Sequence, residues 1–287
     1  MLKQRVVTAI ILLAVLLGAL LATSPWPLIL LLLLAAVCGL WEWLRLTWPG
    51  QGRAAPPMLA VLCGAVMLWL AWQWLAHTPQ PWSIQLQMAL NRQFLPLVAV
   101  LWVVLATALV VQGQSQRRSA GMALSLFGIV AILAVWLALA QMYLQQGAWF
   151  LVSLMALIWF ADIAAYFTGK AFGRHKLAPR VSPGKTWEGA VGGVLAATVW
   201  VLLSAYWPGS FGDALMQRWP WWVVALIAIF LAALSIIGDL FESLLKRRAG
   251  VKDSSQLLPG HGGVYDRIDA LLPVAPIALL ITGVWNP

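Results

Sequence analysis

Apolar runs of about 20 residues recur from one end of the chain to the other. A helix needs about 20 apolar residues to cross the hydrocarbon core of a membrane, and helices satisfy their own backbone groups where no water is present. Hydrophobic residues make up 62% of the chain and charged residues 9%, whereas a soluble domain carries about 25% charged residues. The strand alternation typical of an outer-membrane barrel is absent. The sequence therefore predicts an all-α, polytopic transmembrane helical bundle.

The apolar runs predict about nine spans. They cover residues 6–23, 27–44, 58–76, 95–111, 120–144, 148–168, 187–207, 221–240 and 270–286. Lys3 and Arg5 precede the first run without a clear cleavage site after it, so we expect that run to remain as an anchor. Cytoplasmic loops should hold the excess of Lys and Arg. With the N-terminus inside, all of the 18 basic residues except Arg92 and Arg218 fall on the cytoplasmic side, which predicts a cytoplasmic N-terminus and an outside C-terminus.

The acidic residues divide the chain into two parts. Apart from Glu42 in the second span and Asp213 in an outer loop, the acids lie in or beside two cytoplasmic segments: Asp162, Glu188, Asp239, Glu242, Asp253, Asp266 and Asp269. We therefore expect an N-terminal bundle over 1–150 and a catalytic region over 151–287, with cytoplasmic motif loops at 169–186 and 241–269. Acids inside a span cost about 2.5–3.5 kcal/mol and mark functional sites. We interpret Glu42, Glu188 and Glu242, however, as interfacial residues paired with a nearby Lys or Arg.

Cations and glycines accompany these acids. Lys246, Arg247 and Lys252 precede a small-residue turn at 259–263, and a Gly-Lys-Thr sequence at 184–186 precedes an expected helix. Glycines let backbone N–H groups approach phosphate oxygens, helix N-termini favour anions, and carboxylates from several helix ends suit Mg2+ together with substrate phosphates. The pattern indicates phosphoryl or nucleotidyl transfer at the membrane face. The net charge of +9 follows the membrane topology and does not indicate nucleic acid.

Two motif matches are weaker. The Gly-Lys-Thr sequence lacks the earlier glycine of a P-loop, because Pro179 stands at that position, and no strand is expected before it. His261 and Asp266 have the His-x4-Asp spacing of glycerolipid acyltransferases, but that match leaves the surrounding Lys and Arg residues unexplained.

From Ser243 to Asp269 the sequence reads SLLKRRAGVKDSSQLLPGHGGVYDRID. This stretch resembles the signature of the phosphatidate cytidylyltransferase (CDP-diacylglycerol synthase) family, Ser-x-apolar-Lys-Arg-x4-Lys-Asp-x-small-x2-apolar-Pro-x-His-Gly-Gly-apolar-x-Asp-Arg-apolar-Asp, with no departure at a fixed position. The segments around Asp162 and 176–189 also resemble the bacterial members. The specific resemblance covers about 159–270, and the first 150 residues match only as a hydrophobic bundle.

The resemblance implies transfer of the cytidylyl group of CTP to phosphatidate, giving CDP-diacylglycerol and pyrophosphate, with Mg2+ and, as a further option, a second cation. It also implies a bacterial inner-membrane protein with its active site facing the cytoplasm, and it suggests a homodimer. The residues that we expect to hold metal are Asp239, Asp266, Asp269 and Asp162. The other expected catalytic residues are Lys252 and Asp253. The residues expected to bind substrate phosphates are Ser182, Lys185, Lys246, Arg247, His261, Gly262, Gly263 and Arg267.

Two other functions remain open from the residues alone. A CTP-dependent lipid kinase would share the nucleotide but transfer the terminal phosphate. A transporter would use intramembrane acids as ion sites, although no paired broken helices are apparent and the acids gather on one side of the membrane.

Overall fold

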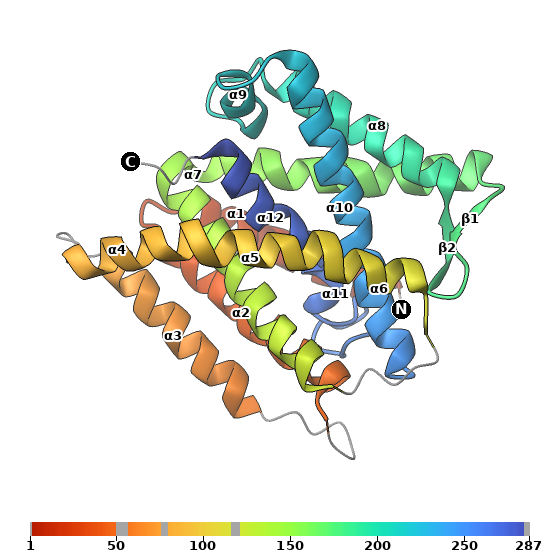
Figure 1. Ribbon diagram of the computed structural model, residues 1–287, viewed down its shortest axis with the longest axis horizontal. Helices are drawn as coiled ribbons and strands as arrows, with labels where there is room; N and C mark the ends of the chain where they lie inside the picture. The colour runs from red at the N-terminus through yellow and green to blue at the C-terminus, as the bar shows by residue number, and fades with distance from the viewer. Residues whose placement is uncertain (1, 50–56, 76–79, 116–120, 284–287) are drawn as a thin grey trace. The chain divides into compact units, whose positions relative to one another are not determined.

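The computed structural model describes residues 2–49, 57–75, 80–115 and 121–283, with side chains from residue 6 onward (Figure 1). It is almost entirely helical, as the sequence predicts. Among the described residues, six helices are long and apolar enough to cross a membrane. They are Trp26–Thr47, Pro57–Leu75, Pro81–Gln112, Met122–Phe172, Trp187–Ser204 and Trp221–Arg248. Arg53, Arg117 and Arg118, three of the basic residues expected on the cytoplasmic side, lie outside the described residues.

The chain divides into two compact units, which are described separately. The first comprises Met1–Val98, Gln116–Ala140 and Leu245–Ile268, and the second comprises Ala99–Ser115, Gln141–Leu244 and Asp269–Pro287. Two long helices, α7 (Met122–Phe172) and α10 (Trp221–Arg248), contribute residues to both units.

The first unit contains most of the N-terminal helices. These are α1 (Leu2–Leu20), α2 (Trp26–Thr47), α3 (Pro57–Leu75), α4 (Pro81–Ala89), the π-helical η1 (Leu90–Phe94) and the first residues of α5 (Leu95–Val100). Its core forms around Trp43 of α2, which is fully buried. The Trp43 ring packs against Phe127 of α7 and Tyr265 of α11 (Tyr265–Ile268), and its indole N–H donates to the Leu124 carbonyl at 2.9 Å. Residues far apart in sequence therefore meet on α2.

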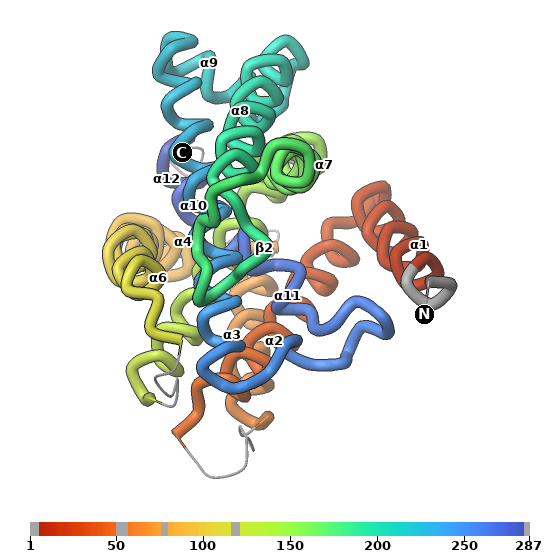
Figure 2. The backbone as a smooth tube through the Cα atoms, turned by 90° about the vertical axis from the view of Figure 1, so that its right-hand side faces the viewer, coloured from red at the N-terminus to blue at the C-terminus, as the bar shows by residue number. Residues whose placement is uncertain are grey.

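The loop at 249–264 also belongs to the first unit. It leaves the end of α10 and reaches toward α1 before it enters α11 (Figure 2). The Thr8 hydroxyl of α1 donates to the Pro259 carbonyl at 2.9 Å. The loop that carries most of the sequence signature is thus attached to the helices of the N-terminal half.

The second unit contains the π-helical η2 (Leu101–Ala106), α6 (Thr107–Gln112), the second part of α7, α8 (Trp187–Ser204), α9 (Phe211–Met216), most of α10, and α12 (Leu271–Thr282). The two spans expected at 120–144 and 148–168 are joined in α7, and the short loop expected between them is reduced to a break at Gly147, whose φ of 83° is left-handed. The span expected at 95–111 is part of a longer helical stretch beginning at Pro81.

An antiparallel hairpin forms in the first motif loop. Strands β1 (Lys176–Ala178) and β2 (Ser182–Thr186) lie beside the first turn of α8 (Figure 1). The expectation that no strand precedes the helix at this point was wrong, although the strand itself carries the Gly-Lys-Thr sequence and Pro179 still excludes a P-loop. Thr186 caps α8, because its hydroxyl oxygen accepts the Gly189 N–H at 3.2 Å.

Helices α7 and α8 approach each other closely at Gly193. A Cβ atom at this position would lie 2.6 Å from the Ala161 carbonyl oxygen and 3.1 Å from the Ala165 Cβ. The contact is therefore too close for any side chain, and it holds the hairpin between the ends of two tightly packed helices.

We expect Gly193→Ala to lower the free energy of unfolding by about 1–3 kcal/mol, the usual cost of overpacking, because the new methyl group would meet backbone. The measurement is a thermal melt in detergent. Gly18→Ala is the matched control, since a Cβ at Gly18 meets nothing within 4 Å and alanine favours helix. Equal melting temperatures for the two variants would show that the α7–α8 contact can relax.

Candidate active site

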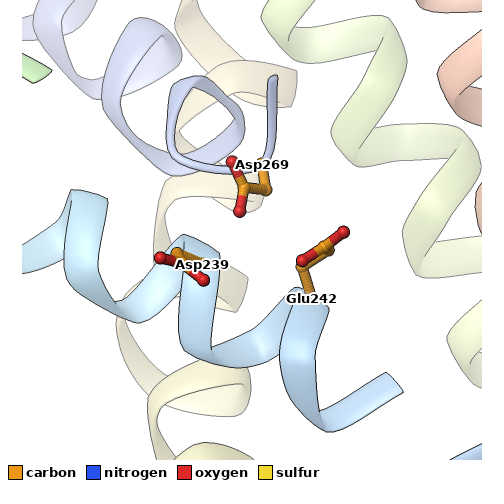
Figure 3. A group of neighbouring side chains, drawn as sticks. All are labelled: Asp239, Glu242 and Asp269. Atoms are coloured by element: carbon orange, nitrogen blue, oxygen red, sulfur yellow. The ribbon is translucent and has the colours of Figure 1, made fainter. Parts of the chain in front are cut away.

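Three carboxylates gather in the second unit. Asp239 and Glu242 come from α10, where a spacing of three residues places them on one helix face. Asp269 comes from the turn before α12, and one ligand oxygen from each of the three lies within 4.8 Å of the others (Figure 3). Carboxylate oxygens at this separation suit a hard divalent cation. We call Asp239, Glu242 and Asp269 the acid group.

A lysine lies against the acid group. The Lys185 Nζ of β2 is 2.5 Å from an Asp239 oxygen, and both side chains are partly exposed. Desolvation of the half-buried Asp269 carboxyl raises its pKa well above the ordinary value, and the Asp239 carboxylate nearby raises it further. The acid group therefore favours a positive neighbour, whether a proton, an ammonium or a metal ion.

A cavity of about 520 Å3 lies in the second unit beside these residues. Four of the residues expected to serve the site line it: Asp162 of α7, Ser182 and Lys185 of β2, and Asp239 of α10. Asp162 is outside the acid group, so its expected contact with metal stays a prediction. The structure nevertheless brings it together with Asp239 at one cavity.

A larger cavity of about 910 Å3 in the same unit is lined mainly by apolar side chains. It lies between α6, α8 and α10, and it shares Leu177, Ala190 and Ile236 with the smaller cavity. Arg180 of the hairpin also lines it. The second unit thus contains, next to each other, the smaller cavity, which we call the polar cavity because Asp162, Lys185 and Asp239 line it, and the apolar cavity.

In the first unit, the Asp266 carboxylate is held by an ion pair and by backbone. The Lys246 Nζ is 2.8 Å from Oδ1, and the exposed fractions of the two side chains are only 14% and 7%. The backbone N–H of Gly263 donates to Oδ2 at 2.8 Å, and the N–H of Ser254 lies 3.2 Å from the same oxygen. The glycine turn expected to hold phosphate therefore also holds Asp266.

The remaining predicted residues of the first unit surround a cavity of about 840 Å3. Its lining includes Lys252, Asp253, His261, Gly262 and Arg267. The Arg267 guanidinium donates to the His261 carbonyl, at 2.6 Å for the shorter of two bonds, and Gly262 has a left-handed φ of 82°. Lys252 and Arg267 of the signature thus line one cavity, whereas Arg247 is exposed in the last turn of α10.

Glu42 is not the interfacial residue that the sequence predicts. Its side chain is fully buried, and its carboxylate accepts hydrogen bonds from the hydroxyls of Ser254 and Ser255 and from the backbone N–H groups of Val264 and Tyr265. Sequence reasoning missed this contact because the partners follow more than 200 residues later. The sequence did contain one indication of a buried role, because Glu42 is a lone acid in an otherwise apolar span.

The other two acids interpreted in this way are Glu188 and Glu242, and the partner of Glu188 is a histidine instead of a Lys or Arg. Glu188 pairs with His175, whose Nδ1 lies 2.7 Å from Oε1 and whose backbone N–H lies 3.2 Å from the same oxygen. Glu242 is buried within the acid group. The spacing of Asp239 and Glu242 on one helix was a signal that could have identified Glu242 as a possible ligand.

Comparison with known proteins covers nearly the whole chain. The family model described as "Cytidylyltransferase family" matches residues 3–285. A phosphatidate cytidylyltransferase of Pseudomonas aeruginosa is 40% identical over 302 residues, covering 100% of this chain and 99% of the relative. One of Haemophilus influenzae is 35% identical and covers 96% of each chain. One of Bacillus subtilis is 30% identical, covering 99% of this chain and 98% of the relative.

Proposed function

The chain belongs to the cytidylyltransferase family, and from this premise we propose that it transfers the cytidylyl group of CTP to phosphatidate. The products are CDP-diacylglycerol, a phospholipid precursor, and pyrophosphate. The structural observation that carries the proposal is the acid group beside a polar cavity that adjoins an apolar one. The reaction needs both kinds of surroundings, because the phosphates of the two substrates require charged side chains and the acyl chains of the lipid require apolar ones.

In this reaction a phosphate oxygen of phosphatidate forms a bond to the α-phosphorus of CTP, and the bond between that phosphorus and the bridging oxygen to the β-phosphate breaks. The electron pair leaves with pyrophosphate. The attacking phosphate is already ionised at pH 7, so no strong general base is required. His261 therefore needs no role in proton transfer, and we assign it to the order of the turn that it occupies.

The acid group fits Mg2+, because three carboxylates with close oxygens match the ligand preference of a hard cation. We propose Asp239 and Asp269 as ligands, as predicted, and add Glu242. Bound there, Mg2+ would supply charge neutralisation at the reacting phosphates. A second cation, and metal contacts of Asp162 and Asp266, stay predictions of the family resemblance.

The protein's own cations hold the phosphates. Lys185 and Ser182 line the polar cavity of the second unit, and we propose that they orient a substrate phosphate there. Lys252 and Arg267 line the cavity of the first unit, where two neighbouring cations suit a polyphosphate. Lys246 acts through Asp266, to which it is bound.

The apolar cavity suits a lipid chain. Its lining comes mainly from apolar side chains of α6, α8 and α10, and it adjoins the polar cavity at Leu177, Ala190 and Ile236. We propose that an acyl chain of phosphatidate lies here while the headgroup reaches the polar cavity. Arg180, which also lines the apolar cavity, would attract the acidic headgroup toward its mouth.

We propose the membrane arrangement that the charges predict: nine spans, the N-terminus in the cytoplasm, the C-terminus outside, and the active site facing the cytoplasm of a bacterial inner membrane. The excess of Lys and Arg in alternate loops supports it. A homodimer and a catalytic region beginning near residue 150 remain parts of the same proposal.

The test uses purified protein in detergent with phosphatidate, Mg2+ and CTP labelled at the α-phosphate. We expect the label to enter the lipid fraction and unlabelled pyrophosphate to be released. Label that enters lipid from γ-labelled CTP, with a polyprenol or other lipid alcohol as acceptor, would instead identify a lipid kinase. Failure of both labels to enter lipid, with folded protein, would overturn the proposal.

A further inference from the structure

Glu42 is a buried carboxylate with four donors from one distant loop. On Oε2 it accepts the Ser254 hydroxyl at 3.0 Å and the Tyr265 N–H at 2.6 Å. On Oε1 it accepts the Ser255 hydroxyl and, at 3.0 Å, the Val264 N–H. A buried charge is tolerated only when its lone pairs are satisfied, and here backbone and hydroxyl groups supply that satisfaction.

The four donors flank the part of the loop that carries the predicted phosphate-binding residues. Ser254 and Ser255 directly follow Lys252 and Asp253, while Val264 and Tyr265 directly follow the glycine turn and precede Asp266. The two flanks are also joined to each other, because the Ser254 and Gly263 N–H groups both donate to Asp266. Glu42 therefore closes the base of a loop whose tip holds His261.

The space beside Glu42 leaves no room for a side chain at position 263, which is a glycine. A Cβ atom on Gly263 would lie 2.5 and 2.6 Å from the two carboxylate oxygens of Glu42 and would overlap the Ser254 hydroxyl. The backbone of the glycine turn is thus in contact with the carboxylate itself. We therefore expect a shift of Glu42 to displace the turn.

The chemistry of the four donors specifies glutamate rather than glutamine. Each carboxylate oxygen accepts one backbone N–H, from Val264 or from Tyr265. A glutamine amide, whichever way it is turned, would place its NH2 group against one of these two N–H donors. Serine hydroxyls can rotate to accept, but a backbone N–H cannot.

We propose that Glu42 is a positioning residue, which sets the geometry of the loop 252–267 so that Lys252 and Arg267 meet the substrate phosphates. The inference rests on the proposed function and extends the site to a helix far outside the sequence signature. Glu42 touches no substrate in this account, because it is fully buried beneath the loop.

The decisive variant is Glu42→Gln, assayed well below its melting temperature. We expect kcat/KM for CTP, per folded protein, to fall about 10- to 100-fold, the usual cost of losing a group that orients functional side chains. Thr47→Val is the matched control, since Thr47 is buried on the same helix and bonds to Ser125 of α7 instead of to the loop. It should melt earlier but keep kcat/KM.

A second variant covers the case in which Glu42→Gln does not fold. Ser254→Ala removes one of the four donors and keeps the carboxylate, and we expect a severalfold fall in kcat/KM. Full activity in whichever of the two variants folds, or a loss equal to that of Thr47→Val, would overturn the inference.

Hydrogen exchange separates this inference from the proposed function. In Glu42→Gln the amides of Val264 and Tyr265 should exchange faster than in the wild type, whereas in Thr47→Val they should not. If the wild-type protein had no transferase activity, the proposed function would be refuted. The exchange rates of the Val264 and Tyr265 amides would still show whether Glu42 orders the loop. Unchanged exchange in Glu42→Gln would refute the positioning of the loop, whatever the activity.

Discussion

Asp239→Asn is expected to lower kcat by about a thousandfold, equivalent to about 4 kcal/mol of transition-state stabilisation. Asp239 belongs to the acid group and also pairs with Lys185. Asparagine keeps the shape of the side chain but loses the charge that pairs with Lys185 and that would hold a metal ion. The measurement is steady-state transfer from α-labelled CTP to phosphatidate, together with titration of Mn2+ binding followed by its paramagnetic resonance signal.

Asp213→Asn is the matched control for this prediction. Asp213 is another acid of the second unit, but it accepts hydrogen bonds from Gly209 and Gln217 beside α9 and lies outside the acid group. Its replacement should leave both kcat and Mn2+ binding unchanged. If Asp239→Asn kept more than about a tenth of the wild-type kcat, or bound Mn2+ as tightly, the assignment of the metal to the acid group would be wrong.

Lys246→Met is expected to cost about 3 kcal/mol of unfolding free energy, at the lower end of the range for breaking a buried ion pair. The change leaves the Asp266 carboxylate, 7% exposed, without the ammonium 2.8 Å away. Replacing both members, as Lys246→Met with Asp266→Asn, should recover part of the loss, because the buried carboxylate charge is then removed together with the ammonium. Thermal melts of the two single variants and the double variant would measure the coupling.

Arg247→Met provides the comparison for Lys246. The two residues are neighbours on α10, but Arg247 is exposed, and exposed charges contribute little to stability. Additive effects of the two single replacements at Lys246 and Asp266 would show that the pair contributes no coupling, contrary to the prediction.

Much of the fold could be predicted because a membrane leaves few options. Runs such as 27–44 and 221–240 must be helical where no water can satisfy the backbone, and α2 and α10 cover both. The hairpin in the first motif loop was missed because its strands contain Lys176, Pro183 and Gly184 and have no alternating pattern. The π-helical segments η1 and η2 likewise have no sequence pattern that distinguishes them from α-helix.

The candidate site was predictable where its residues are close in sequence. Lys252, His261 and Arg267 were identified together and do line one cavity. Glu42 was misinterpreted, and Glu242 was not identified as a possible ligand, because a charge near a span end more often serves solvation than binding. The partners of Glu42 depend on tertiary packing between α2 and α11, and no local rule of periodicity or capping reports on such a contact.

The burial of Glu42 also has a consequence for how the chain is made. Its first partner, Ser254, is synthesised 212 residues later, which at about 5–20 residues per second takes roughly 10–40 seconds. During that interval α2 resides in or near the bilayer with a carboxyl group that the loop has not yet reached, and a charge there is costly. The Glu42 carboxyl group therefore lacks these four donors until the loop that contains Ser254 and Tyr265, close to the end of the chain, has been made. A chain truncated before residue 254 would lack all four donors to Glu42, so we expect its second helix to keep an unsatisfied carboxyl group.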